Sequence, residues 1–291
     1  MSTAAGTPSP SAFTADPSRP FGRRAPYRAP LSAGTDPNQI LQHAVDCYTR
    51  GRVYDALDVC EQVMAQFPGL SQGVLALTYD MYQQIKDADR HTLYQARYFD
   101  FGIRPGDKVL DIGSGHIPLA FATHLADFAV DDDSYGRAGT PFKHVAGKPV
   151  FNCHVEKMPF ADKEFDFVYC SHVLEHVEDP QRACQELMRV GKRGYLETPT
   201  LGKDVWLNVG KISNHRWHVS LFNDTLEFTE YSPRLLAGVE TDLLIDMHIN
   251  PQTEREKAFS ALVLLKSDIL NTMLLWDGQF SVSVRRATAS G

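Results

Sequence analysis

The segment that most constrains the fold is an apolar strand that runs directly into a glycine-rich turn. It reads Val109-Leu110-Asp111-Ile112-Gly113-Ser114-Gly115. Glycines allow a sharp turn after a strand and let the backbone approach a ligand closely. The third glycine position of the dinucleotide-binding pattern holds Ile117, followed by Pro118. This departure argues against a nicotinamide dehydrogenase and leaves a different nucleotide-like ligand as the expectation.

Strand-like and helix-like segments alternate after Arg90, which predicts a parallel sheet covered by helices on both faces. The expected strands cover residues 108–112, 149–153, 165–170, 193–198, 218–222, 225–231 and 279–284. The expected helices cover residues 180–190, 235–245 and 256–265. The strands on either side of Asn223-Asp224 should form a hairpin. We therefore predict an α/β fold with a parallel sheet and late antiparallel strands.

The N-terminal region divides into two parts by composition. Residues 1–35 are rich in Ala, Pro, Ser, Thr and Gly and lack the apolar run of a secretory signal, which predicts a disordered tail. Residues 36–95 have helical spacing, with Asp36 as the N-cap of a first helix. This segment resembles one tetratricopeptide repeat at Ala44, Gly51, Ala56 and Pro68. We interpret it as a helical cap on a main domain of residues 96–291; the alternative is a module for protein contact or self-association.

Composition narrows the class of protein. The formal net charge of -7 argues against nonspecific nucleic-acid binding, which needs a basic surface. No apolar run approaches the length of a membrane span. The five cysteines form no CxxC pair, which is typical of reduced thiols in a cytoplasmic protein. We expect a cytoplasmic protein whose partner is a small molecule.

Three further motifs follow the glycine-rich turn in order. They are Met158-Pro159-Phe160 with Phe165-Asp166, then Ser171-His172-Val173-Leu174-Glu175-His176, then Glu186-Leu187-Met188-Arg189-Val190. Together with the turn they resemble the class I S-adenosylmethionine-dependent methyltransferases that act on small molecules. The resemblance is close over residues 106–199 and implies a Rossmann-like sheet and S-adenosylmethionine as the cofactor.

The resemblance also implies which residues hold the methionine and ribose of the cofactor. Gly113, Ser114 and Gly115 would line the methionine part, with Asp111 near its ammonium group. An acid at the end of the second strand would bind the ribose hydroxyls, because a carboxylate can accept two hydrogen bonds. That acid is Asp127 if residues 123–126 form a strand, or Asp131 if residues 118–124 form a helix. We favour Asp127.

The adenine and the methyl group would lie against two later segments. His154, Val155 and Glu156 occupy the segment that contacts adenine in related enzymes. His154 stands where those enzymes often have an acid, and a neutral imidazole nitrogen could accept the same hydrogen bond. Ser171 should face the methyl-donor end of the pocket, at the tip of its strand.

Histidines after the same strand and before the hairpin are the candidates for acceptor chemistry. His172 or His215 would act as the general base, and His176, Arg216 and Trp217 would contact the substrate. The alternative for Trp217 is a place in the core. The spacing of His172 and His176 would suit a metal, but no third ligand is evident in the sequence, so we expect no metal site.

These residues predict transfer of a methyl group to an oxygen or nitrogen atom of a small metabolite or sugar-like intermediate. A histidine base is needed mainly for a hydroxyl acceptor. The alternative is a non-catalytic scaffold with a methyltransferase-like domain and a helical interaction module.

Overall fold

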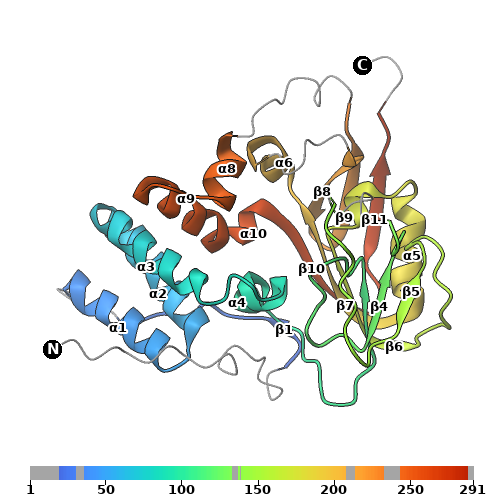
Figure 1. The fold of residues 1–291 in the computed structure, drawn as a ribbon, viewed down its shortest axis with the longest axis horizontal. Helices are drawn as coiled ribbons and strands as arrows, with labels where there is room; N and C mark the ends of the chain where they lie inside the picture. Colours follow the sequence, from blue (N-terminus) through green and yellow to red (C-terminus); the bar gives the residue numbers. More distant parts are fainter. Residues whose placement is uncertain are drawn as a thin grey trace. The chain divides into compact units, whose positions relative to one another are not determined.

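The computed structural model describes residues 20–30, 36–132, 137, 139–207, 214–232 and 243–287. The chain divides into two compact units, drawn in Figure 1. The first comprises Met1–Gly102 with Asp246–Ser267, and the second comprises Ile103–Ile245 with Asp268–Gly291. Each unit is described by itself below.

The first unit is mainly helical. Its elements are β1 (Gly22–Arg23), α1 (Pro37–Thr49), α2 (Val53–Gln66), the 3-10 helix η2 (Pro68–Leu70), α3 (Ser71–Gln83), the π-helical turn η3 (His91–Gln95), α4 (Ala96–Tyr98), β2 (Phe99–Asp100) and α9 (Glu254–Leu265). Asp36 caps α1 by accepting the N–H of Asn38, as predicted. Gly51, at φ 77°, reverses the chain before α2. Ala44 and Ala56 are fully buried, which lets α1 and α2 pack closely.

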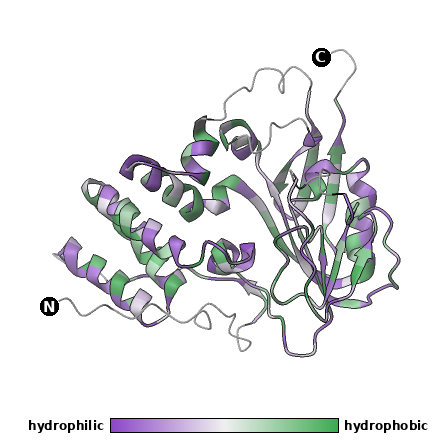
Figure 2. Cartoon of the chain, viewed as in Figure 1, coloured by the Kyte–Doolittle hydropathy of each residue, from purple (hydrophilic) through white to green (hydrophobic). Residues whose placement is uncertain are grey.

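Helix α1 shows why these helices assemble. Polar and apolar residues alternate along it in Figure 2, and its buried residues are Ile40, Ala44 and Cys47. Their spacing of three and four residues places them on one face of the helix. The apolar face is buried in a core that includes residues of α2, α3 and α9.

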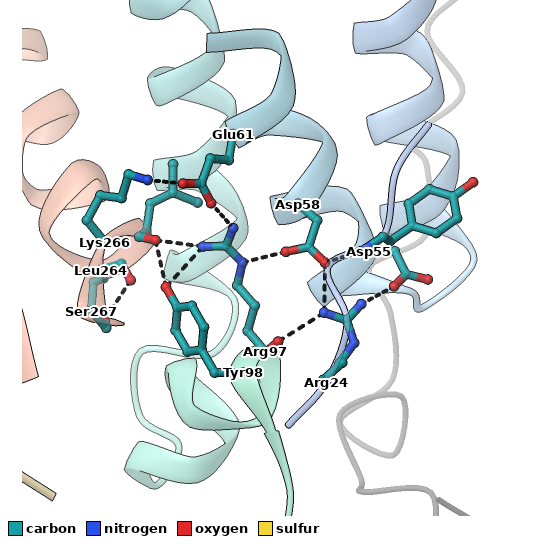
Figure 3. A network of polar contacts seen from close by, with 11 residues as sticks. Arg24, Asp55, Asp58, Glu61, Arg97, Tyr98, Leu264, Lys266 and Ser267 are labelled. Atoms are coloured by element: carbon teal, nitrogen blue, oxygen red, sulfur yellow. Dashed lines mark hydrogen bonds and ion pairs between the residues drawn. The ribbon is translucent and has the colours of Figure 1, made fainter. Parts of the chain in front are cut away.

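A buried ionic network joins α2, α4 and the end of α9 (Figure 3). The guanidinium of Arg97 donates from Nε to Asp58 Oδ1 at 2.8 Å and from Nη1 to the carbonyl of Leu265 at 2.6 Å, and it also pairs with Glu61. Arg24 donates from Nη1 to Asp58 Oδ2 at 2.7 Å. Leu265 ends α9, so Arg97 also satisfies a carbonyl that has no partner within its own helix.

The first unit differs from the predicted boundaries in two ways. Residues 20–30, assigned to a disordered tail, include β1, which pairs with β2, and Ala29, which is buried. The segment Asp246–Ser267, assigned to the main domain, belongs to the helical unit because α9 packs on α3 and binds Arg97. The rest of the predicted tail, residues 1–19 and 31–35, lies outside the described residues.

The second unit contains a six-stranded sheet of order β10-β7-β6-β3-β4-β5. The strands are β3 (Val109–Ile112), β4 (His124–Asp127), β5 (Val150–Asn152), β6 (Phe165–Ser171), β7 (Gly191–Pro199) and β10 (Asn271–Asp277). Neighbouring strands are parallel except for β10, which runs antiparallel to β7. Leu110 of β3 pairs with Val168 of β6 on one side and with His124 of β4 on the other. The sheet confirms the predicted Rossmann-like α/β fold with a late antiparallel strand.

The second unit also contains a three-stranded sheet. It consists of β8 (Trp217–Phe222), β9 (Thr225–Glu230) and β11 (Ser281–Arg285) in the order β11-β9-β8. Strands β8 and β9 form the predicted hairpin, with Asn223 at φ 51° in its turn. Trp217 and Phe228 of this sheet share one apolar core with Leu110, Val168 and Leu196 of the larger sheet.

The second unit also contains the 3-10 helix η4 (Leu174–His176), α5 (Pro180–Val190) and α6 (Leu201–Leu207). Two further helices, α8 (Leu243–Ile249) and α10 (Ser267–Leu270), each cross a boundary between the two units. Helix α5 has the predicted bounds, while most of the helix expected over 235–245 lies outside the described residues. The part of the chain that the structure describes has no helix of the length and apolarity needed to cross a membrane.

Candidate functional site

The glycine-rich turn follows β3 and is held against the end of β4. The N–H of Gly113 donates to the carbonyl of Ala126 at 2.8 Å, and the N–H of Gly115 donates to Asp127 Oδ2 at 2.7 Å. Gly113 has a φ of 76°, and a Cβ there would lie 2.1 Å from Cγ2 of Val173. Only glycine satisfies both the backbone conformation and this contact.

The connection from β3 to β4 shows which of the two candidate acids ends the second strand. No helix is present over residues 116–123, all of which are described, and β4 begins at His124. Asp127 therefore ends the second strand of the parallel run, as favoured by the sequence analysis. Asp131 lies in an exposed turn beyond it. Burial raises the pKa of the Asp127 carboxyl, opposed by the hydrogen bond from Gly115 and the charge of Arg137.

Ser114 in the turn and Asp111 in β3 differ in the polar groups that they offer a ligand. The hydroxyl of Ser114 is buried and has no hydrogen-bond partner among the described residues. With Asp127 it gives this edge a free hydroxyl beside a carboxylate, which fits a cofactor that carries hydroxyl and amino groups. Asp111 is instead buried, and its Oδ2 accepts the N–H of Leu119 at 2.7 Å. The structure therefore gives the Asp111 carboxylate a role in fixing the connection, not the predicted place at an ammonium group.

The predicted adenine segment follows β5, and only part of it is accessible. His154 is partly exposed, and its ring lies edge-on to Phe128 with the centroids 5.1 Å apart. Val155 is buried in the core, so only its backbone could touch a ligand. The Glu156 carboxylate accepts the N–H groups of Glu178 and Asp179, at 2.8 and 2.9 Å. The side chains of Val155 and Glu156 thus both stabilise the fold, and contact of these residues with a cofactor stays a prediction.

Ser171 and His172, at the end of β6, meet two buried carboxylates. His172 Nε2 lies 3.1 Å from Glu197 Oε1, and its Nδ1 lies 3.3 Å from Glu175 Oε1. Ser171 Oγ lies 3.4 Å from Glu197 Oε1. Lys203 Nζ also lies 3.5 Å from His172 Nε2. Because both ring nitrogens are engaged by side chains of the protein, the geometry favours a positioning role for His172 over the predicted role of general base.

The backbone of His172 supports a positioning role. Its φ is 58°, a conformation that is costly for a residue other than glycine. The N–H of His172 donates to the carbonyl of Glu197 at 2.8 Å, which ties the residue after β6 to β7. Burial would raise the pKa of Glu197, but the hydrogen bond and charge of His172, the charge of Lys203 and the hydrogen bond of Tyr195 outweigh it and lower the pKa to about 2.

A second cluster brings His176 and His215 together, as two of the predicted acceptor residues. Their ring centroids are 4.8 Å apart. His215 Nδ1 lies 3.0 Å from Asp204 Oδ1, and Asp204 Oδ2 accepts the hydroxyl of Tyr231 at 2.7 Å. Burial would lower the pKa of His215, but the hydrogen bond that His215 donates to Asp204 and the nearby carboxylate charges raise it above its ordinary value. His215 is thus oriented by a carboxylate, in the manner of a general base or a metal ligand.

The other two predicted substrate contacts are engaged elsewhere. Trp217 has an exposed fraction of 0%, and its Nε1 donates to the carbonyl of Val177 at 2.7 Å. The prediction that Trp217 stacks on substrate is therefore wrong, and the core alternative is correct. Arg216 Nε donates to Glu230 Oε1 at 3.0 Å, so its guanidinium already has an anionic partner in the protein.

Sequence reasoning missed the acidic partners of these histidines. The sequence placed Glu175 in the motif that follows β6 but predicted no contact for it, and it predicted no role for Glu197 or Asp204. Glu197 lies two residues before the end of β7 at Pro199, and an acid near the end of an apolar strand could have been noticed. Asp204 lies in α6 and offers no such signal, since only the fold brings it to His215.

Comparisons with known proteins agree with the geometry of this unit. Residues 110–196 match a family described as a methyltransferase domain. A ubiquinone/menaquinone biosynthesis C-methyltransferase, UbiE, from Xanthomonas campestris is 30% identical over 161 residues, covering 50% of this chain and 63% of that protein. The corresponding protein from Bordetella avium is 34% identical over 135 residues, covering 41% of this chain and 51% of that protein. The chain thus spans only part of the relatives that it matches.

The fold can also be compared with a solved structure. An S-adenosylmethionine-dependent methyltransferase from Methanosarcina mazei is 18% identical, covers 62% of this chain and 95% of its own, and has a TM-score of 0.30. This likeness is too weak to carry an argument, and the tetratricopeptide resemblance of the first unit receives no support from the comparisons. The family match lies within the unit that carries the six-stranded sheet and the ordered motifs, and residues 110–196 of this unit are similar to a methyltransferase domain.

Proposed function

We propose that this protein transfers the methyl group of S-adenosylmethionine to an oxygen or nitrogen atom of a small metabolite. The observation that carries the proposal is the joined end of β3 and β4, where the N–H of Gly115 holds Asp127 beside the buried hydroxyl of Ser114. Asp127 would accept the ribose hydroxyls, and Ser114 with the glycine backbone would hold the methionine part. His154 is the remaining side chain of the adenine segment that a ligand can reach.

The bound cofactor supplies an electrophilic methyl group, so the protein needs no nucleophile of its own. The protein's contribution is to hold the acceptor in line, which can lower the barrier by roughly 7–11 kcal/mol. His172, held between Glu175 and Glu197, fixes the end of β6. The acceptor's proton would leave beside His176 and His215. These two histidines form a cluster with Glu175, the residue that also contacts His172.

The nature of the acceptor atom is the finer part of the proposal. The relatives carry the name C-methyltransferase, which makes a carbon acceptor the alternative. A polar cluster of histidines and carboxylates favours a hydroxyl or amine, because these groups lose a proton when they are methylated. Incubation with methyl-labelled S-adenosylmethionine and panels of hydroxylated, amino and activated-carbon metabolites, read by mass spectrometry, separates the two.

Calorimetry with S-adenosylhomocysteine tests the donor site directly. We expect binding by the unchanged chain and a loss of about 10- to 100-fold in affinity for Asp127→Asn, the worth of charge-assisted hydrogen bonds. Asp131→Asn is the matched control and should bind as tightly as the unchanged chain. Absence of binding at millimolar ligand would favour the scaffold alternative. Equal losses in the two variants would contradict the assignment of the ribose to Asp127.

A further inference from the structure

Three side chains of the second unit converge with the geometry of a metal site. One ligand atom each from Glu175, His176 and His215 lies within 4.8 Å of the other two. Two of these residues are adjacent in η4, and the third precedes β8. The spacing of His172 and His176 had suggested a metal pair without a third ligand, but His172 is not part of this cluster. The fold instead joins Glu175 and His176 to His215, which lies 39 residues beyond His176.

The Glu175 carboxylate provides the first independent indication of a ligand. Its exposed fraction is 1%, and its Oε1 faces the ring of His172. Its Oε2 is fully buried and has no hydrogen-bond partner among the described residues. A buried carboxylate oxygen without a partner is costly, and the usual solutions are a hydrogen bond, an ion pair or a metal ion.

Both histidines are held in the manner of metal ligands. His176 Nδ1 lies 2.9 Å from the carbonyl of Asn214, and His215 Nδ1 lies 3.0 Å from Asp204 Oδ1. The carbonyl and the carboxylate can only accept, so each Nδ1 carries the hydrogen and each neutral ring has its lone pair on Nε2. Metal-bound histidines almost always donate their other N–H to a carboxylate or a backbone carbonyl. The cluster contains one example of each.

The backbone further fixes the positions of these ligands. The carbonyl of Glu175 accepts the N–H of Arg216 at 2.8 Å, which joins η4 to the segment that carries His215. The N–H of Tyr231 in turn donates to the carbonyl of Arg216 at 3.0 Å. The three ligands therefore lie on two segments, η4 and the residues before β8, that are hydrogen-bonded to each other. Partial exposure of the His176 side chain leaves a route for an ion from solvent.

Local charge favours a cation at the same point. Glu175, Glu197 and Asp204 are all buried, and His172 lies between Oε1 of Glu175 and Oε1 of Glu197, with Lys203 Nζ 3.5 Å from its Nε2. A divalent ion beside Glu175 Oε2 would neutralise the carboxylate oxygen that these groups do not reach.

We propose that Glu175 Oε2 and the Nε2 atoms of His176 and His215 bind one divalent transition-metal ion, with Zn²⁺ as the best match. Two imidazoles and one carboxylate are an established set for zinc sites that keep a fourth position open. Zinc bonds to these atoms are about 2.0–2.2 Å long, so two ligands of one tetrahedral ion lie about 3.4 Å apart. The ligand atoms lie within 4.8 Å of one another, so the side chains need to close by at most about 1.4 Å.

The open position gives the ion a function that rests on the proposed methyl transfer. A hydroxyl of the acceptor bound to the ion would become more acidic and would give its proton to solvent water. Its oxygen would then bond to the methyl carbon of S-adenosylmethionine as the methyl–sulfur bond breaks, and the electron pair of that bond would stay on the sulfur of the departing S-adenosylhomocysteine. This role would favour an acceptor that presents oxygen, such as a phenol or an enol.

Titration of the untagged full chain with ZnCl₂ after chelator treatment tests the site without any measurement of activity. A chromophoric zinc indicator gives the affinity, and Co²⁺ gives a visible spectrum whose intensity reports a tetrahedral site. We expect one equivalent to bind, with an affinity at least 100-fold weaker in His215→Gln and in Glu175→Gln. Asp204→Asn alters the side chain that His215 shares with Tyr231 without removing a ligand, and it should weaken binding by about 10- to 100-fold. His144→Gln changes an exposed histidine outside the cluster and should bind as the unchanged chain does.

The outcomes separate this proposal from the proposed function. Absence of stoichiometric binding, or unchanged binding by the His215 and Glu175 variants, would overturn the metal site. Binding of S-adenosylhomocysteine by the same samples would then leave the methyltransferase proposal standing. Near-native circular dichroism of the metal-free variants shows that a lost affinity reflects a lost ligand. If a ligand variant fails to fold, Asp204→Asn and the Co²⁺ spectrum of the unchanged chain still decide the matter.

Discussion

Replacing Arg97 with methionine should strongly destabilise the helical unit. The Arg97 side chain has an exposed fraction of 3%, and it joins Asp58 and Glu61 of α2 to the last carbonyl of α9. Removing one partner of a buried ion pair costs about 3–5 kcal/mol, because it leaves the other charge buried and uncompensated. Asp58 retains Arg24, which places the expected loss near the lower limit, at about 3 kcal/mol.

Arg52→Met is the matched control for this change. Arg52 also pairs with an acid of α2, Asp55, at 2.7 Å, but its side chain has an exposed fraction of 43%. An exposed pair contributes about 0–1 kcal/mol, so this variant should lose less than about 1 kcal/mol. The two variants remove the same chemical group and differ mainly in burial.

The chain offers a way to observe the two units separately. All three tryptophans, Trp206, Trp217 and Trp276, belong to the second unit, whereas the first unit holds most of the long helices. Urea unfolding followed by far-ultraviolet circular dichroism reports both units, and tryptophan fluorescence reports the second. We expect Arg97→Met to lower the free energy of unfolding measured by circular dichroism. A loss no greater than that of Arg52→Met would refute the argument that the buried network stabilises this unit.

Two further predictions follow from local geometry. Gly113→Ala should lower the free energy of unfolding by about 3 kcal/mol or more, because the new Cβ meets Val173 at a residue with a positive φ. Gly147→Ala is the control, since its φ is also positive but the space around its Cβ is open. It should cost about 1–2 kcal/mol, measured for both variants by thermal unfolding. Burial lowers the pKa of His91 to about 4, so the unfolded chain takes up a proton first as the pH falls below about 6.5. The contribution of His91 to the free energy of unfolding is therefore complete above pH 6.5 and is lost toward pH 4, with a loss of about 2 kcal/mol at pH 5. In His91→Gln, the free energy of unfolding should fall less over the same pH range.

These two predictions can each fail in a distinct way. Equal losses for the two glycine variants would show that backbone conformation, not the contact with Val173, limits the turn. An identical fall in stability between pH 7 and pH 5 for the unchanged chain and His91→Gln would show that other groups account for the acid sensitivity.

Features set by neighbouring residues could be predicted from the sequence. The period of α1, its N-cap Asp36, the bounds of α5 and the β8–β9 hairpin all depend on contacts within a few residues. The placement of Asp127 succeeded for the same reason, because strand β4 required only a short apolar run after the turn. Strand β10 was missed because Asn271–Asp277 contains an apolar run without alternation. Its strand form depends on antiparallel pairing with β7, which no local pattern announces.

The candidate site shows where local reasoning stops. Trp217 and His215 are two residues apart, yet one is sealed in the core by Val177 while the other is turned toward Glu175 by Asp204. The local sequence around these two residues does not indicate which side chain is buried in the core and which one faces Glu175. The deciding contacts come from η4 and α6, and they also change the chemistry expected of the histidines. His172 becomes a positioning residue because two carboxylates engage its ring, and His215 gains an oriented lone pair because one carboxylate engages only Nδ1. The chemistry of each histidine is therefore set by the number of acids that the fold brings to it, a quantity that depends on long-range packing.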